Sequence, residues 1–264
     1  MCGIAGFLAD SGGVAPGRLA RMLAALRHRG PDGEGTRLFS RRGETALVDG
    51  ASERDPAAGL AHARLAVLDL SADGAEPMSN EDGSWWLTFN GEIYNHLALR
   101  NELTAAGHTF RSRCDAEVIL HGLEAWGVGL PARLRGMYAW AALHLPSSSL
   151  WLARDPWGIK PVYLALTGSV TAFASELTAL EAGGFTGGLS RQALEAYVGL
   201  GFVPSPLCLL EGVRKLRPGE LVRVQGGRAE TLGMVAPPMP PQHRTHQGAL
   251  NAVESEVQEV LKDS

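Results

Sequence analysis

The spacing of hydrophobic side chains predicts helices at several places along the chain. Residues 18–27 carry four apolar side chains at the i, i+3, i+4, i+7 spacing of an amphipathic helix, and Gly30 suits its end. Asn95 and Ser190 each precede another such stretch, where they could act as N-caps. The further predicted helices cover residues 96–106, 116–126, 176–181, 191–198 and 249–262.

Between the helices, apolar runs bounded by turn residues predict strands. These runs cover residues 1–8, 60–69, 84–89, 137–145, 150–153, 162–166 and 170–174. Asn90-Gly91 separates the run 84–89 from the extended residues 92–94, and this dipeptide favours a tight hairpin turn with Gly91 at positive φ. So many antiparallel-type strands with few helices predict an α+β protein.

Composition narrows the function classes. The chain has 264 residues, of which 45% are hydrophobic, so it can bury a full core. A net charge of −4 and a pI near 6.1 give no basic field, so we expect no nucleic-acid partner. No apolar run reaches the length of a membrane span and the start lacks a signal-peptide pattern, so we expect no membrane partner.

The cysteines and histidines do not predict a disulfide framework or a metal site. Three widely spaced cysteines argue against a disulfide framework and predict a reducing, cytoplasmic location. His243 and His246 have a spacing that suits a metal, but they follow the proline-rich residues 234–242 with no further ligand nearby. We therefore expect no metal site.

Cys2 stands out because removal of Met1 makes it the N-terminal residue. It then carries both a nucleophile and a base, since the α-amine has a pKa of about 7.7–8.0 and is partly neutral near pH 7. An N-terminal amine is a known activator of its own side chain. Taken alone, Cys2 also fits an ordinary thiol at the start of a first strand.

Five short segments decide between these interpretations. They are MCGIAG at residues 1–6, HRGPDG at 28–33, HARLAVL at 62–68, FNGEIYN at 89–95 and RDPWGIKP at 154–161. In this order and spacing they closely resemble the class II glutamine amidotransferase domain of glutamine-hydrolysing asparagine synthetases. The resemblance is dense over residues 2–180 and looser over residues 201–216.

The resemblance implies a fold and a division of the chain. The implied fold is the N-terminal nucleophile hydrolase sandwich, an α+β fold with four layers (αββα) in which two antiparallel sheets lie between helices. Residues 2–184 would form the glutaminase domain and residues 185–232 a bridging segment. Residues 233–264 would form a proline-rich linker and the start of an incomplete synthetase domain.

The resemblance also implies a mechanism, the hydrolysis of L-glutamine to glutamate and ammonia. Cys2 would form the thioester with its own α-amine as the base. The Asn90 side-chain amide and the Gly91 backbone N–H would form the oxyanion hole, where loss of one donor typically lowers the rate about 10²–10³-fold. Without the resemblance, Asn90-Gly91 is a plain hairpin turn, and the two interpretations are compatible.

The resemblance further implies how glutamine is bound. Arg64 would bind the α-carboxylate by paired hydrogen bonds, while Glu92 and Asp115 would hold the α-ammonium. Each has a simpler interpretation: a surface ion pair for Arg64, a solvated strand residue for Glu92, and the N-cap of the helix over 116–126 for Asp115. Backbone groups that face the same substrate would come from Leu65, Ala66, Val67 and Leu68.

Some segments carry no implied chemistry, and two positions depart from the family. We assign no catalytic role to residues 28–33, and residues 154–161 support the fold more than the chemistry. Cys114 replaces a small hydroxyl residue and adds a second thiol near the predicted pocket. Ala66 replaces a common serine, so only its backbone contacts would remain.

The second half of an asparagine synthetase is not found in the sequence. We see no Ser-Gly-Gly-x-Asp-Ser loop to cradle pyrophosphate, so ATP and Mg²⁺ are expected only in a missing synthetase domain and no cofactor in this chain. We expect a truncated or split synthetase, or a free glutaminase half that delivers ammonia to a partner protein. A homodimer is possible.

Three alternatives stay open. The ammonia acceptor could be the substrate of a tailoring amide synthetase rather than aspartate. Sugar-phosphate and purine-pathway amidotransferases share the Cys2 start but differ from this chain at residues 89–95. A non-catalytic scaffold half is the third, and the joint presence of Cys2, Arg64, Asn90, Gly91 and Asp115 argues against it.

Overall fold

Two antiparallel sheets form the centre of the molecule. The computed structural model describes residues 1–41, 45–46, 56–67, 69, 71–238 and 258. The first sheet contains β1 (Gly3–Ala9), β2 (Gly33–Phe39), β3 (Thr45–Ala46), β4 (Ala58–Arg64), β9 (Tyr163–Thr167), β10 (Val170–Ala174) and β11 (Val213–Lys215). Their order in this sheet is β11-β9-β10-β1-β4-β2-β3.

The second sheet has the order β13-β12-β8-β7-β6-β5. Its strands are β5 (Met78–Ser79), β6 (Trp85–Ile93), β7 (Gly136–His144), β8 (Ser149–Arg154), β12 (Glu220–Gln225) and β13 (Arg228–Met234). The segment predicted to be a bridge thus adds β11 to one sheet and β12 and β13 to the other. The domain division itself stays a prediction.

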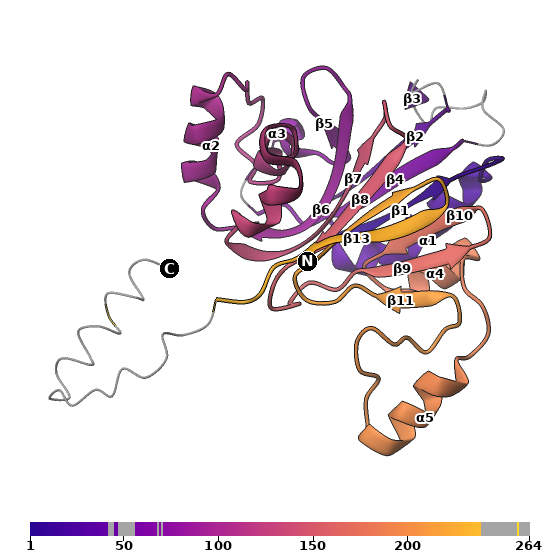
Figure 1. Cartoon of the computed structure of the whole chain (residues 1–264). Coiled ribbons are helices and arrows are strands. Elements are labelled where there is room, and N and C mark those ends of the chain that lie inside the picture. The colour runs from indigo at the N-terminus through magenta and orange to yellow at the C-terminus, as the bar shows by residue number, and fades with distance from the viewer. Residues whose placement is uncertain (42–44, 47–55, 68, 70, 239–257, 259–264) are drawn as a thin grey trace, which may run out of the picture.

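Helices cover the outer faces of the two sheets (Figure 1). The five α-helices of the described residues are α1 (Pro16–Leu26), α2 (His96–Ala105), α3 (Glu117–Trp126), α4 (Leu177–Gly183) and α5 (Arg191–Leu200). Short 3-10 turns are η1 (Arg27–Arg29), η2 (Ala72–Gly74) and η3 (Gly127–Ala132). Helices α1 and α4 pack on the first sheet, and α2 and α3 pack on the second.

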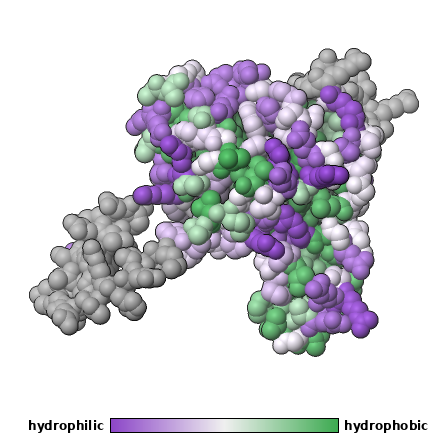
Figure 2. Space-filling view, in the orientation of Figure 1, coloured by the Kyte–Doolittle hydropathy of each residue, from purple (hydrophilic) through white to green (hydrophobic). Residues whose placement is uncertain are grey.

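Three apolar cores separate the four layers. Between the sheets, Ile4 and Leu60 of the first sheet pack with Leu143 and Leu152 of the second. One outer core lies under α1 and α4, and the other lies under α2 and α3. The predicted αββα sandwich is therefore confirmed. Helix α5 projects away from both sheets, and its end carries exposed apolar surface (Figures 1 and 2).

Two predicted helix caps have different outcomes. The Ser190 hydroxyl accepts a hydrogen bond from the Ala193 N–H at 3.3 Å, which confirms it as the N-cap of α5. Asn95 precedes α2, but its side chain bonds to the backbone of Arg133 and Arg135 instead of capping the helix. Asn95 therefore fixes the turn before β7. The predicted helix over 249–262 and the histidines at 243 and 246 lie outside the described residues, apart from residue 258.

The predicted hairpin at Asn90-Gly91 is wrong, because both residues lie inside the continuous strand β6. Gly91 pairs with Tyr138 of β7 and does not adopt a positive φ. A Cβ atom at Gly91 would lie 2.3 Å from the carbonyl oxygen of Met137, so glycine is required by close packing of the strands. The predicted strand 60–69 instead ends at Arg64, where its neighbours β1 and β2 no longer offer pairing partners.

Candidate active site

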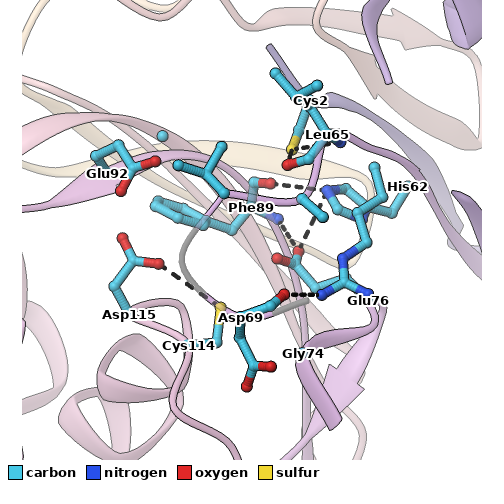
Figure 3. Close-up of a pocket in the computed structure, with 14 residues that line it drawn as sticks. Cys2, His62, Leu65, Asp69, Gly74, Glu76, Phe89, Glu92, Cys114 and Asp115 are labelled. Atoms are coloured by element: carbon cyan, nitrogen blue, oxygen red, sulfur yellow. Dashed lines mark hydrogen bonds and ion pairs between the residues drawn. The ribbon is translucent and has the colours of Figure 1, made fainter. Parts of the chain in front are cut away.

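Most of the predicted site residues line one cavity (Figure 3). Cys2 precedes β1, Arg64 ends β4, Gly91 and Glu92 lie in β6, and Asp115 lies before α3. The cavity brings together Cys2, Arg64, Leu65, Ala66, Val67, Gly91, Glu92 and Asp115. Leu68 lies outside the described residues. Asn90 is buried next to these residues but does not line the cavity.

The Cys2 thiol is half-buried and held against the chain after β4. Its Sγ atom lies 3.4 Å from the backbone nitrogen of Leu65 and 3.5 Å from the carbonyl oxygen of the same residue. Burial raises the pKa of the thiol, and the hydrogen bond from the Leu65 amide offsets part of this rise. Because burial favours the neutral thiol, a nucleophilic role requires a base beside it.

Beyond its short pairing with β5, strand β6 has an unpaired edge whose backbone amides point away from β7, on the side of the cavity. Tyr138, the partner of Gly91, donates its N–H to the Asp155 carboxylate and accepts a hydrogen bond from the Asp155 N–H. Both backbone groups of Tyr138 thus point away from β6, and the Gly91 N–H in turn points away from β7. On the same edge, the Phe89 N–H donates to the Glu76 carboxylate at 2.5 Å.

The next amide along this edge is also occupied. The Ile93 N–H donates to Asp115 Oδ2 at 2.7 Å. Gly91 stands between these two occupied positions, and no acceptor for its amide is found in the part of the chain that the structure describes. The edge thus offers one open donor between two filled ones.

Asn90 provides a second open donor. Thr88, two residues before it, bonds to the Ala61 carbonyl of the first sheet, so the alternation of β6 directs Asn90 toward that sheet as well. Asn90 is 1% exposed, and its Nδ2 atom has no hydrogen-bond partner among the described residues. Buried donors are rarely left without an acceptor, which points to an acceptor brought by a ligand.

Arg64 is oriented by backbone carbonyls. Its guanidinium donates to the carbonyl oxygen of Ser71 at 3.0 Å and to that of Asp69. A Cβ atom at Gly74 would lie 2.8 Å from Arg64 Nη2, so this glycine makes room for the guanidinium. No carboxylate of the described residues forms an ion pair with Arg64, and the contacts of its guanidinium with the Ser71 and Asp69 carbonyls argue against the interpretation as a surface ion pair.

The structure contradicts the simpler interpretations of two acidic residues, Asp115 as an N-cap and Glu92 as a solvated strand residue. Helix α3 begins after Ala116 without a side-chain cap, so Asp115 is not an N-cap; its carboxylate is committed to β6 instead. Burial raises the pKa of Asp115. Burial and the nearby Asp115 raise the pKa of Glu92, which is half-buried at the cavity rather than solvated.

Sequence reasoning missed a buried pair in the same cavity, His62 and Glu76. His62 Nε2 lies 3.1 Å from the Phe89 carbonyl, and burial lowers the pKa of His62 to about 4, so the ring is neutral and donates this hydrogen bond. Burial raises the pKa of Glu76, which lies 3.8 Å from His62. His62 lay inside a quoted motif, whereas nothing in the pattern around Glu76 marked it.

Comparison with known proteins identifies the family to which this chain belongs. Residues 1–233 match the model of the glutamine amidotransferase domain family. The chain belongs to this family. A putative glutamine-hydrolysing asparagine synthetase of Mycobacterium tuberculosis is 38% identical over 253 residues, covering 89% of this chain and 36% of that protein. Asparagine synthetase 1 of Bacillus subtilis is 35% identical over 201 residues, covering 76% of this chain and 29% of that protein. The amidotransferase domain thus spans about a third of the length of these relatives.

Solved structures support the fold of the amidotransferase domain. Glutamine phosphoribosylpyrophosphate amidotransferase of B. subtilis superposes with a TM-score of 0.67 at 20% identity, covering 88% of this chain and 50% of that chain. The predicted N-terminal nucleophile hydrolase fold is confirmed by this likeness. Among the residues described, no helix is long and apolar enough to cross a membrane. The cytoplasmic location, the absence of nucleic acid and the homodimer stay predictions.

The remaining motif of the amidotransferase domain is structural. Arg154 donates to the carbonyl oxygens of Lys160 and Leu216 at 2.9 Å and 2.6 Å. The Asp155 carboxylate accepts hydrogen bonds from backbone amides of the same segment. Residues 154–161 therefore hold the turn after β8. In the segment 28–33, Asp32 accepts a hydrogen bond from the Ala66 amide at 2.9 Å and thus fixes one wall of the cavity.

Proposed function

We propose that this domain hydrolyses L-glutamine to glutamate and ammonia through a thioester on Cys2. The observation that carries the proposal is the open Gly91 amide in the cavity that also holds the Cys2 thiol, next in the chain to the buried and unpartnered Asn90 Nδ2. Hydrolysis of an amide develops negative charge on its oxygen, and donors fixed in advance stabilise that charge. An open amide in the same cavity as a nucleophile, with a second unpartnered donor at the preceding residue of the strand, suits this task.

The proposed reaction begins once Met1 is removed. The α-amine of Cys2 takes the thiol proton, and sulfur attacks the side-chain amide carbon of glutamine to form a C–S bond. The tetrahedral oxyanion is held by Asn90 and Gly91. The amine returns the proton to the leaving nitrogen, the C–N bond breaks, and ammonia departs. Water then attacks the thioester, the C–S bond breaks, and glutamate and the Cys2 thiol are released.

Charges in the cavity support glutamine as the substrate. An amino acid carries one carboxylate and one ammonium group. Arg64 supplies the guanidinium that lines the cavity, and it has N–H donors beyond those bonded to the Ser71 and Asp69 carbonyls that can bind a carboxylate. Glu92 and Asp115 supply acidic groups for the ammonium, and a cation beside them would offset the effect of burial on their pKa values. Backbone groups are proposed from Leu65, Ala66, Val67 and Leu68.

We further propose that the ammonia serves ATP-dependent synthesis of asparagine from aspartate. The support is the relatives of this chain, which are named asparagine synthetases. The synthetase unit would bind ATP and Mg²⁺. An apolar surface suits contact with such a unit: Tyr94, Trp157 and Ile159 are each more than half exposed and line a hollow that Pro238 also reaches.

Ammonia release from L-glutamine tests the proposal. The wild-type chain should release ammonia with Cys2 at its N-terminus, and Cys2→Ala should abolish release. Cys208→Ala is the matched control, because this buried thiol does not line the cavity. Ammonia release by Cys2→Ala at the wild-type rate would contradict the mechanism.

Binding of glutamine in calorimetry without turnover, also with a synthetase partner added, would favour the scaffold alternative. An acceptor other than aspartate would identify a tailoring amide synthetase.

A further inference from the structure

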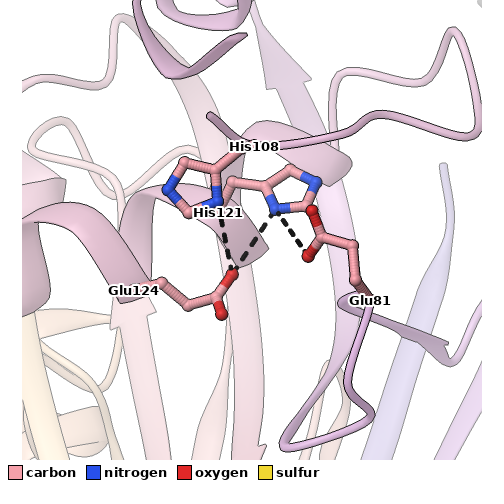
Figure 4. A group of neighbouring side chains, drawn as sticks. All are labelled: Glu81, His108, His121 and Glu124. Atoms are coloured by element: carbon pink, nitrogen blue, oxygen red, sulfur yellow. Dashed lines mark ion pairs between the residues drawn. The ribbon is translucent and has the colours of Figure 1, made fainter. Parts of the chain in front are cut away.

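Four side chains from three separate segments converge on the outer side of the second sheet (Figure 4). Glu81 lies in the turn between β5 and β6, His108 in the loop between α2 and α3, and His121 and Glu124 lie one turn apart on α3. Each offers one ligand atom, and these four atoms all lie within 4.8 Å of one another. None of the four residues lines the proposed active site.

Three of the six separations among the ligand atoms come close to those between the ligands of a small tetrahedral ion. His121 Nδ1 lies 3.4 Å from Glu81 Oε2 and 3.4 Å from Glu124 Oε2, and His108 Nδ1 lies 3.7 Å from Glu124 Oε2. Zinc binds nitrogen and oxygen at about 2.0–2.2 Å, which places tetrahedral ligands about 3.3–3.6 Å apart. The observed separations are close to these values and long for hydrogen bonds.

His121 is the buried member of the cluster. Its side chain is 1% exposed, and neither ring nitrogen has a hydrogen-bond partner among the described residues. The Nδ1 atom faces the two carboxylates, and Nε2 lies 3.7 Å from Glu117 Oε1. A ligating histidine commonly turns its second nitrogen toward a carboxylate, so Glu117 occupies the position of an outer-sphere partner. A buried imidazole whose nitrogens face carboxylates but form no hydrogen bond requires an explanation, and an ion between them supplies one.

Both carboxylates are oriented by their other oxygen. Glu81 Oε1 accepts a hydrogen bond from the Thr109 amide at 2.9 Å, which leaves Oε2 facing His121. Glu124 Oε1 accepts one from Asn80 Nδ2 at 2.9 Å, which leaves its Oε2 facing both histidines. The ligand atoms are therefore held by contacts outside the cluster, as in a site that is ready to bind.

We propose that Glu81, His108, His121 and Glu124 form a binding site for a divalent transition-metal ion, with Zn²⁺ the ion that fits best. Two imidazole nitrogens and two carboxylate oxygens suit zinc and its neighbours, whereas Mg²⁺ and Ca²⁺ prefer an all-oxygen shell. The ion would tie the β5–β6 turn and the α2–α3 loop to α3. Its role is structural, since all four ligands come from the protein and none lines the active site.

A proton is the competing occupant. Burial disfavours the charged form of His121, but the carboxylates of Glu117 and Glu81 raise its pKa overall. An imidazolium could therefore neutralise the cluster without a metal. The two occupants differ in what they bind: zinc displaces the proton, and its affinity depends on every ligand.

Zinc and cobalt binding to the full chain, stripped with a chelator, tests the site. Wild-type protein should bind one Zn²⁺ per chain at this site and gain thermal stability from it. His108→Gln and Glu81→Gln replace the partly exposed ligands, so the variants should fold. Each should weaken zinc binding by more than the roughly 10–100-fold that loss of an outer-sphere partner causes.

Control variants and the visible spectrum of bound Co²⁺ distinguish metal binding at these four residues from binding elsewhere on the protein. His144→Gln and Glu102→Gln change a histidine and a glutamate elsewhere and should leave zinc affinity unchanged. Bound Co²⁺ should show the visible bands of a tetrahedral site without the charge-transfer band of a cobalt–thiolate bond, which would indicate Cys2 or Cys114. Failure of wild-type protein to bind zinc, or equal affinity in His108→Gln, Glu81→Gln and the controls, would overturn the proposal. Either result leaves the glutaminase proposal untouched.

Discussion

Arg29 Nε donates a hydrogen bond to the main-chain carbonyl oxygen of Cys2 at 2.9 Å. The same guanidinium pairs with the carboxylate of Glu176 at 2.7 Å, so the end of η1 and the start of α4 jointly hold the residue that carries the thiol. Arg29 does not line the cavity. It is therefore a positioning residue, and its effect on the reaction must pass through Cys2.

Replacement of Arg29 by lysine should lower kcat while leaving KM for glutamine nearly unchanged. Lysine keeps the charge but cannot bond to the Cys2 carbonyl and Glu176 with one planar group. A hydrogen bond of this kind contributes about 1.5–3 kcal/mol, which corresponds to a decrease of roughly 10–150-fold. His28→Gln is the control, because exposed His28 contacts the same Glu176. Equal kcat values for the two variants would exclude this role.

Asn90→Ala should reduce kcat for glutamine hydrolysis by about 10²–10³-fold with a small change in KM. The removed amide stabilises charge that develops only in the transition state, and such donors act mainly on kcat. Asn101→Ala on the exposed face of α2 serves as the control. Steady-state kinetics of glutamine hydrolysis measure kcat and KM for both variants. A rise in KM at constant kcat would show instead that Asn90 binds the substrate in its ground state.

Gly91→Ala should both destabilise the protein and abolish hydrolysis. The new Cβ would lie 2.3 Å from the Met137 oxygen and 2.7 Å from the Tyr138 Cα, both backbone atoms that cannot turn aside. Overpacking of this kind lowers the free energy of unfolding by about 1–3 kcal/mol. Gly233→Ala is the matched strand variant, because nothing lies within 4 Å of its Cβ position. Denaturant unfolding compares the two, and equal losses would contradict the packing argument.

Glu76→Gln should stabilise the protein at neutral pH and lose this advantage as the pH falls. Burial raises the pKa of Glu76 in the folded state above its unfolded value near 4.5. The folded state therefore binds more protons between these two pKa values, and the free energy of unfolding of the wild type falls as pH rises through that window. Glutamine retains an oxygen for the Phe89 amide without the charge.

Thermal unfolding from about pH 4 to pH 8 measures this effect, with the exposed Glu102→Gln as the control. The melting temperature of Glu76→Gln should exceed that of the wild type most at high pH. A constant difference between the two proteins at every pH would contradict the assignment of the effect to Glu76 ionisation.

Periodicity in the sequence predicted most of the helices and strands, whereas the four layers and most of the cavity residues were implied by the resemblance of five motifs to a known family. It could not predict the strand geometry at Asn90-Gly91. The same dipeptide suits a turn and a tightly packed strand, and only the close approach of β7 distinguishes the two. Asp115 was ambiguous for a similar reason, since a residue before a helix suits a cap unless another strand takes its carboxylate.

The features that the sequence did not predict depend on contacts between residues far apart in the chain. Arg29 and Cys2 are far apart in the chain, and no local pattern connects them. The proposed metal ligands come from three segments, and only His121 and Glu124 share a helix, so no ligand motif is visible in the sequence. Both features depend on how the helices dock on the sheets, which hydrophobic periodicity does not specify.

The identity of the acylated sulfur tests the central claim most directly. Wild-type protein mixed with L-glutamine and quenched within a turnover should yield an N-terminal peptide that begins at Cys2 and carries a γ-glutamyl group, which hydroxylamine releases as the hydroxamate. Cys114 is the internal comparison, because its thiol lines the same cavity and burial raises its pKa strongly. We predict the adduct on Cys2 alone. An adduct on Cys114, or ammonia release from protein that retains Met1, would contradict the account.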